Sequence, residues 1–301
     1  MEMFKNIARY IKNRVSKVFP RIYVLSFTAI DYLRFYSNLK KHDTLNNSTL
    51  EYSNIKDVLS KNGVCVIEDF WDATTCAEAR AEVDRILLEY KDFVHPSPKA
   101  DSRIFGAENL SDVIGRFSNH PMLTHLASYY NNVPTRPAFT MAAKMSASIG
   151  NLGSGEGWHR DAFFRQFKSI IYLSDVGEEN GPFQLMEKSH KFWWVLKDTW
   201  YGRLSYMNSR ISDGQVDDLI RKNPSRLKTY TAKAGTLILV DTSSIHRGMP
   251  INNGVRYALT NYFFPEQRIG NELFKQFAPV AGVIDVDRNF IKKTKEMSFN
   301  K

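Results

Sequence analysis

The chain has 301 residues, 43% of them hydrophobic, and a formal net charge of +9. This length and composition predict one large domain with a full hydrophobic core. Two cysteines exclude a disulfide framework, and we expect both as buried thiols in a reducing cytoplasm. Residues 1–41 hold nine Lys/Arg against two acidic residues, so they carry +7 and the remainder only about +2. The basic balance therefore belongs to the N-terminal segment, and without a zinc, helix-turn-helix or RNA-binding motif we expect no nucleic acid partner.

Residues 1–41 form a predicted basic, amphipathic helical extension. Apolar residues recur at helical spacing over 3–19, Pro20 interrupts, and a second apolar stretch covers 22–36. The extension is too short and too charged to span a bilayer, and it lacks a small-residue cleavage site. Two interpretations stay open: residues 1–36 lie on an anionic membrane, or they pack on the domain or a partner subunit. The expected location is cytoplasmic, with peripheral contact at the inner membrane surface in the first case.

Residues 42–53 read as a polar linker, and 54–301 as the main domain. Helices are expected over 55–61, from a cap at Asp72 or Thr74 to about residue 90, and over 121–130, with a strand over 63–69. After Pro137 the pattern changes to short apolar runs separated by Gly, Asn and Pro: 138–147, 157–161, 168–175, 182–187, 227–233, 235–241, 246–250 and 256–264.

That pattern is typical of an antiparallel jelly roll, also called a double-stranded β-helix. The predicted fold class is therefore α+β with a mainly β core at about 137–265 and flanking helices. An aromatic, helix-prone insert at about 193–222 interrupts the strands. We expect this insert to cover the mouth of the site.

His159 and Asp161 are two residues apart, and His246 follows 85 residues after the first histidine. Side chains two apart on a strand point to the same face, so the pair can bind one metal ion. A distant second histidine completes a 2-His-1-carboxylate facial triad, which leaves other coordination positions open. The three residues are the predicted metal ligands, and the spacing favours a non-haem Fe(II) oxygenase.

Several motifs accompany the triad in a fixed order. Asn180-Gly181-Pro182 leads to Ser189-His190, Gly235-Thr236-Leu237 precedes Asp241 and His246, and Arg256-Tyr257-Ala258-Leu259 follows. With these motifs, residues 60 to 265 resemble the phytanoyl-CoA dioxygenase family of Fe(II)/2-oxoglutarate oxygenases. The resemblance implies Fe(II) as cofactor, 2-oxoglutarate and O₂ as co-substrates, and hydroxylation of a small molecule or metabolite conjugate with release of succinate and CO₂. Related halogenases lack the carboxylate, so Asp161 favours hydroxylation.

The resemblance also assigns co-substrate contacts. Arg256 is expected to bind the distal carboxylate of 2-oxoglutarate, because a guanidinium pairs with a carboxylate through two hydrogen bonds. Tyr172 matches an aromatic position near the co-substrate, and Lys144 is a candidate for a second cationic contact. Gly248 stands where relatives carry a serine that contacts the co-substrate, so that contact must come from elsewhere or be absent.

The substrate is not identified by the sequence. Phe163, Phe164 and Arg165 directly follow the metal motif and are expected to face or flank the substrate cavity. Arg160 is expected to point away from the metal. Two other functions stay open: the same iron chemistry giving desaturation or epimerisation, and a non-catalytic jelly-roll binding protein at a membrane surface. The oligomeric state stays open as well.

Overall fold

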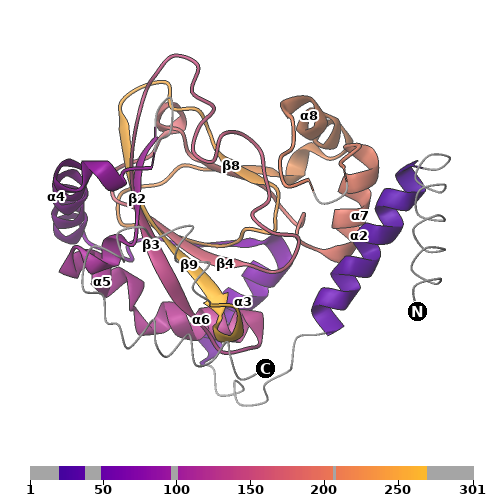
Figure 1. The fold of residues 1–301 in the computed structure, drawn as a ribbon, viewed down its shortest axis with the longest axis horizontal. Helices are drawn as coiled ribbons and strands as arrows, with labels where there is room; N and C mark the ends of the chain where they lie inside the picture. Colours follow the sequence, from indigo (N-terminus) through magenta and orange to yellow (C-terminus); the bar gives the residue numbers. More distant parts are fainter. Residues whose placement is uncertain (1–19, 38–48, 96–100, 206–207, 270–301) are drawn as a thin grey trace.

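Two antiparallel sheets face each other and form a jelly roll (Figure 1). In this computed structural model, residues 20–37, 49–95, 101–205 and 208–269 are described. The larger sheet has the strand order β1-β7-β4-β9-β3-β2 and the smaller one β6-β5-β8. The strands are β1 (Val64–Ile67), β2 (Asp101–Phe105), β3 (Thr135–Ser146), β4 (Phe167–Tyr172), β5 (Phe183–Met186), β6 (Leu227–Tyr230), β7 (Leu237–Asp241), β8 (His246–Gly248) and β9 (Val255–Pro265).

Helices cover the outer face of the larger sheet, and a second group lies at the other end of the molecule (Figure 1). The first group is α3 (Leu50–Asn62), α4 (Ala73–Glu89), α5 (Asp112–Ser118) and α6 (Pro121–Asn131). The second is α2 (Pro20–Ser37), α7 (Phe192–Tyr201) and α8 (Asp213–Lys222). The short 3-10 turns are Lys91–Phe93, Ala107–Asn109, Glu178–Asn180, Pro224–Arg226 and Glu266–Arg268.

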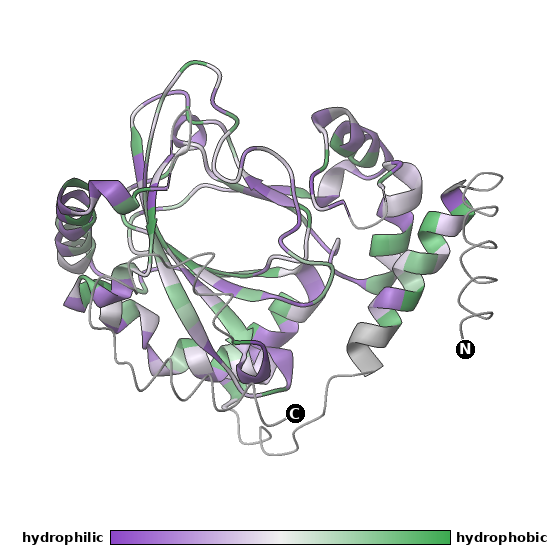
Figure 2. Ribbon diagram, in the orientation of Figure 1, coloured by the Kyte–Doolittle hydropathy of each residue, from purple (hydrophilic) through white to green (hydrophobic). Residues whose placement is uncertain are grey.

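Strand alternation separates the core into an outer and an inner layer. On β7, Leu237 and Leu239 pack among the helices, while Ile238 and Val240 belong to the inner cluster between the sheets. All four are fully buried, which explains why this strand is apolar without interruption. Hydrophobic residues likewise follow the long central strands β3 and β9 (Figure 2). The inner layer leaves room for polar side chains at one end, and the site lies there.

Most of the predicted strands after Pro137 are found close to their expected positions, and α4 and α6 match their predicted ranges. The exception is the run 157–161, which forms no strand and pairs only through isolated bridges at His159. Two elements were not predicted, the edge strand β2 and the helix α5. The linker prediction needs correction, because α3 already begins at Leu50, where Thr49 caps it by accepting the Tyr52 N–H. The predicted helix at 3–19 lies outside the described residues. The insert contains α7 and α8, and α2 occupies the second apolar stretch.

A partly buried glutamate, Glu108, packs against the outer side of β3 and makes the stability of the fold depend on pH. The Glu108 carboxylate accepts the Thr140 N–H at 2.8 Å, and burial raises the pKa of Glu108 to about 7. The folded state therefore binds a proton more tightly than the unfolded chain does. The resulting stabilisation is complete below about pH 4.5 and is lost as the pH rises through about 7.

Glu108→Gln is expected to remove this loss, because the amide carries no charge to desolvate while its oxygen still accepts the Thr140 N–H. Relative to the wild type, the variant should gain about 2–3 kcal/mol of unfolding free energy between pH 4.5 and pH 8. Urea unfolding at several pH values measures this difference. A difference that stays constant over the range would contradict the prediction.

Candidate metal centre

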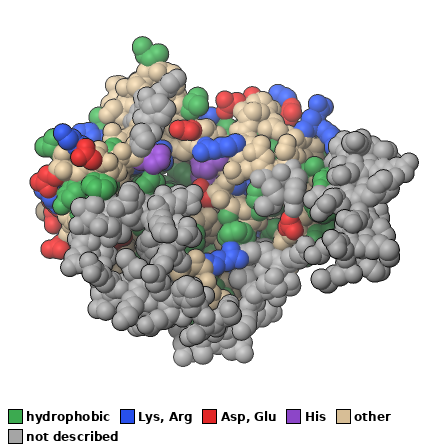
Figure 3. Space-filling view, viewed as in Figure 1, with side chains coloured by type: hydrophobic (Ala, Val, Ile, Leu, Met, Phe, Trp, Pro, Cys, Tyr) green, Lys and Arg blue, Asp and Glu red, His purple; other side chains and the backbone are tan. Residues whose placement is uncertain are grey.

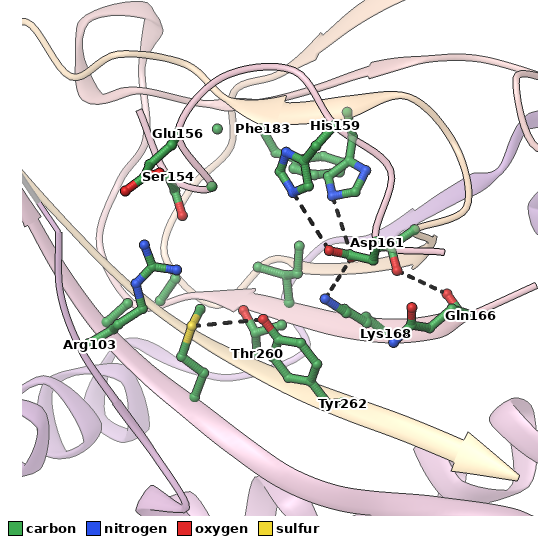
Figure 4. A pocket seen from close by; sticks show the side chains of 18 of the residues that line it. Arg103, Ser154, Glu156, His159, Asp161, Gln166, Lys168, Phe183, Thr260 and Tyr262 are labelled. Atoms are coloured by element: carbon green, nitrogen blue, oxygen red, sulfur yellow. Dashed lines mark hydrogen bonds and ion pairs between the residues drawn. The ribbon is translucent and has the colours of Figure 1, made fainter. Parts of the chain in front are cut away.

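His159 and His246 face each other across an isolated antiparallel bridge that closes one end of the barrel. The N–H of each residue donates to the carbonyl of the other at 2.9 Å. Asp161 is held next to this bridge, where its N–H donates to the Thr242 carbonyl at 3.0 Å. The potential ligand atoms of the three side chains lie within 4.8 Å of one another. Figure 4 shows His159 and Asp161 side by side. The backbone therefore brings the predicted triad together.

The two imidazoles present the same nitrogen to the carboxylate. Nε2 of His159 and Nε2 of His246 each lie 3.6 Å from an oxygen of Asp161. The opposite nitrogens, Nδ1, lie 2.9 Å from the Gly157 carbonyl and 2.8 Å from the Ser244 carbonyl. A carbonyl accepts only from a protonated nitrogen, so the proton is assigned to Nδ1 and the Nε2 lone pair is free to bind metal.

Charge at the site also suits a divalent cation. Burial lowers the pKa of both imidazoles, that of His246 to about 3, so both are neutral near pH 7. Burial alone would raise the pKa of the Asp161 carboxyl, but Lys168 and the two histidines hold it well below its usual value. Two neutral imidazoles and an ionised carboxylate are the protonation states that a metal requires. The residues present therefore fit a mononuclear iron site.

Arg160 points away from the metal ligands, as expected. Its side chain is buried and donates to the Ser189 carbonyl at 2.8 Å and to the Ser243 carbonyl. Ser189 in turn accepts the Ile245 N–H through Oγ at 2.8 Å. Arg160 and the Ser189-His190 motif thus fix the segment that carries His246, and this explains the motif without a contact to the metal.

The triad lies in a cavity of about 570 Å³ between the two sheets. Figure 3 shows histidine side chains in the hollow that leads inward. On β9 the lining side chains alternate from Arg256 to Phe264, and on β4 from Lys168 to Tyr172. This volume suits a small molecule, whose sites in proteins typically occupy ~300–1,000 Å³.

Arg256 lies in this cavity with its charge buried. Only 5% of the residue is exposed, its NH2 group donates to Met145 Sδ at 2.7 Å, and its Nε has no hydrogen-bond partner among the described residues. A Cβ added at Gly248 would lie 3.1 Å from that guanidinium. Gly248 follows His246 by two residues on β8, which places Arg256 roughly 7 Å along the strand from the metal ligand. A buried guanidinium with unused donors is suited to a carboxylate ligand.

Tyr172 contributes its ring to the cavity wall while its hydroxyl is committed elsewhere. The hydroxyl donates to the Tyr230 carbonyl at 3.1 Å and accepts the Phe183 N–H at 2.9 Å. Burial raises the pKa of this phenol. Tyr172 therefore offers the cavity an aromatic face rather than a hydrogen-bond donor.

A glycine-rich loop that contains Gly153, Gly155 and Gly157 borders the cavity next to Gly248. A Cβ on Gly155, at φ +82°, would lie 2.3 Å from Cε1 of His159, so only glycine fits. Ser154 lines the cavity, and its Cβ lies 2.8 Å from the position of a Cβ built on Gly248. Ser154 thus lies next to Gly248, where the sequence analysis expected a co-substrate contact to be absent or supplied from elsewhere.

The candidate contact by Lys144 is not supported, since its side chain lies outside the cavity. Ala143 and Met145 line the cavity, so strand alternation directs Lys144 to the opposite face of β3. There its ammonium pairs with Asp84 on α4 at 2.8 Å. The sequence could not show this, because β3 is apolar on both faces.

Another lysine occupies the interior. Lys168 on β4 is 5% exposed, lies 2.7 Å from Asp161 Oδ2 and covers the Tyr262 ring at 3.6 Å (Figure 4). The sequence could have predicted this position, because Lys168 is four residues before Tyr172 and therefore lies on the same face of the strand. Sequence reasoning also missed Arg103, Arg210 and Gln166, which line the cavity from β2 and from loops.

The three residues predicted to contact substrate, Phe163, Phe164 and Arg165, lie in different surroundings. Phe164 lines the cavity, with the Arg268 guanidinium over its ring. Phe163 is half-buried and is not among the lining residues. Arg165 turns toward α6, where it donates to the Tyr130 carbonyl at 2.6 Å and covers the Tyr130 ring. Of these three residues, Phe164 alone lines the cavity.

Substitution of the two lysines tests the placement of Lys168 inside the cavity and of Lys144 outside it. In a dry interior, loss of one partner of an ion pair costs about 3–5 kcal/mol, but the Asp161 side chain keeps 22% exposure. Lys168→Met is therefore expected to lower the unfolding free energy of the metal-free protein by about 2 kcal/mol. Lys144→Met should cost about 0.5 kcal/mol, as for a surface pair.

Added Mn(II) should restore stability selectively in Lys168→Met, because the cation replaces the lost counter-charge of Asp161. Thermal unfolding of both variants with and without Mn(II) measures this. Equal destabilisation of the two variants, unaffected by Mn(II), would contradict the placement of Lys168.

Several solved structures share this fold. The alpha-ketoglutarate-dependent epimerase SnoN from nogalamycin biosynthesis shares 18% identity at a TM-score of 0.55, covering 72% of this chain and 84% of that one. EctD from S. alaskensis shares 17% identity at a TM-score of 0.57, covering 73% and 79%. HygX from Streptomyces hygroscopicus, solved with nickel and 2-oxoglutarate, shares 17% at 0.50, covering 72% and 87%. No curated protein sequence matches the chain.

A jelly roll with a 2-His-1-carboxylate site defines the class of mononuclear metal enzymes to which the iron/2-oxoglutarate oxygenases belong. The sequence model of the phytanoyl-CoA dioxygenase (PhyH) family matches residues 59–256, about two thirds of the chain. The chain belongs to this family, and the resemblance predicted from its motifs is confirmed.

Proposed function

We propose that this protein is an Fe(II)- and 2-oxoglutarate-dependent hydroxylase of a small molecule or metabolite conjugate, releasing succinate and CO₂. The observation that carries the proposal is the shared cavity, which holds both the triad and the buried guanidinium of Arg256. A protein that only binds a ligand needs neither. Bound Fe(II) with 2-oxoglutarate and O₂ would supply the oxidising power to break a substrate C–H bond.

The residues of the chain would bind and orient the reactants. His159, Asp161 and His246 would hold the metal on one side, leaving the cavity side for co-substrate and O₂. Arg256 would fix the distal carboxylate of 2-oxoglutarate. Phe164 would form part of the substrate wall. The surrounding inner core would limit access of water to the reacting atoms.

Epimerisation is the second candidate, because SnoN, an epimerase, shares the fold. The same iron site supports both outcomes, and the position of the substrate decides whether oxygen is transferred. Incubation of candidate substrates with isotopically labelled O₂ separates the two: a hydroxylase product gains one labelled oxygen atom, whereas an epimerised product gains none. Loss of two hydrogens would instead indicate desaturation.

Anaerobic titration of the metal-free protein with Fe(II) and 2-oxoglutarate tests the proposal before any substrate is known. The expected result is a weak visible charge-transfer band that requires both additions and weakens sharply in Arg256→Met. Folded protein that takes up no iron and gives no band would reject the enzyme and favour the binding protein.

A further inference from the structure

Exposed aromatic and aliphatic side chains gather on the outer side of α2 and α7. On α7, Trp193, Lys197 and Trp200 share one helix face by their spacing, and Trp193 is 71% exposed. On α2, Ile22 and Leu33 are 54% and 58% exposed. Large apolar side chains in one area of surface indicate an interaction site rather than chance exposure. We call this surface the α2–α7 face; its apolar members are Ile22, Ile30, Leu33, Trp193, Trp200 and Tyr201.

The two helices form one continuous surface because they lie antiparallel. At one end Tyr32 contacts the Phe192 ring, with centroids 5.1 Å apart, and its hydroxyl donates to the His190 carbonyl. At the other end the Arg21 guanidinium lies 5.1 Å from the Trp200 ring. Figure 1 shows the pair on the opposite side of the barrel from α4.

Exposed cations accompany the apolar side chains of α7. Lys191, Lys197 and Arg203 are exposed along and beside α7, and Lys222 lies over the Tyr201 ring at 5.6 Å. The only acidic residue of α7, Asp198, is buried and paired with Arg226 at 2.7 Å. The charge offered by α7 to solvent is therefore positive.

The sequence that precedes Pro20 carries further positive charge. Residues 1–19 contain five Lys/Arg and one Glu, and they join the fold at Pro20, next to the Arg21–Trp200 contact. The combination of exposed Trp and Tyr with Lys and Arg is the composition of surfaces that bind the interface of anionic membranes. Among the described residues, no helix is long and apolar enough to cross a membrane.

We propose that the α2–α7 face binds the surface of an anionic lipid bilayer, with the aromatic side chains in the headgroup region and the lysines near lipid phosphates. The protein would then work as a peripheral enzyme at the inner membrane surface. The proposal is independent of the oxygenase reaction, because none of the residues of this face lines the catalytic cavity.

Co-sedimentation of the full chain with vesicles tests the proposal. Vesicles of phosphatidylglycerol and phosphatidylcholine should bind the protein, pure phosphatidylcholine vesicles should bind it much less, and salt should weaken binding. Trp193→Ser/Trp200→Ser and Lys191→Glu/Lys197→Glu should each reduce partitioning at least about tenfold. Leu88→Ser and Lys91→Glu are the matched controls, since both residues are exposed at the α4 end, and they should bind as the wild type does.

Two results would overturn the proposal. The first is equal binding of the wild type and the α2–α7 variants, or no binding to anionic vesicles at all. The second is a concentration-dependent dimer in light scattering that the Trp variants abolish without vesicles, which would make the face a contact between copies. Iron and 2-oxoglutarate binding should be unchanged in every variant, so failure here is distinguishable from failure of the proposed function.

Discussion

His246→Ala is expected to abolish turnover and to weaken Fe(II) or Mn(II) binding by more than about 100-fold. Loss of an outer contact to a metal ligand already costs about 10–100-fold, and this change removes a ligand itself. The fold should survive, because the bridge between His246 and His159 is made by backbone groups. Metal titration followed by 2-oxoglutarate decarboxylation measures both effects.

His125→Ala on α6 is the control, because it removes an imidazole that lies outside the cavity. It should bind metal and turn over 2-oxoglutarate as the wild type does. If His246→Ala kept full metal affinity, the 159–161–246 site would be wrong and the ligands would have to be sought elsewhere in the chain.

The metal site could be predicted because its signal is local. His159 and Asp161 are recognisable from their spacing, although His159 lies on an isolated bridge rather than in a regular strand. The motifs around His246 restrict which histidine completes the triad. The strands after Pro137 could be predicted for a similar reason, since Gly, Pro and Asn separate them. Strand β2 escaped prediction because its sequence, Asp101 to Phe105, shows neither an apolar run nor strict alternation.

The residues that line the cavity could be predicted only on strands whose two faces differ in polarity. Lys144 lies in an apolar strand whose two faces are both buried, so its direction depends on packing that the sequence does not display. Lys168 was recognisable only after Tyr172 had been assigned to the interior. Arg165 is adjacent to the motif but turns outward to Tyr130, which shows that proximity in sequence is weak evidence for contact outside regular strands.

Arg256→Met is expected to raise the dissociation constant for 2-oxoglutarate by about 30- to 4,000-fold, which corresponds to about 2–5 kcal/mol. Methionine fills similar space but offers no donor to the carboxylate. Arg256→Lys keeps the charge and loses the two-pronged geometry, so its effect should be intermediate. Metal affinity should not change in either variant, since Arg256 does not contact the triad. Calorimetric titration of the metal-loaded protein under anaerobic conditions measures the affinities.

The stability of Arg256→Met separates loss of a binding group from damage to the fold. In the wild type, a guanidinium is buried with an unpaired Nε, and burial lowers its pKa, so it costs free energy until a carboxylate arrives. Without 2-oxoglutarate, Arg256→Met is therefore expected to be more stable than the wild type by about 1–2 kcal/mol. With saturating 2-oxoglutarate the order should reverse, because only the wild type gains binding energy. A variant that is less stable in both conditions would show that Arg256 is structural, and the carboxylate contact would then have to be assigned to another cavity residue.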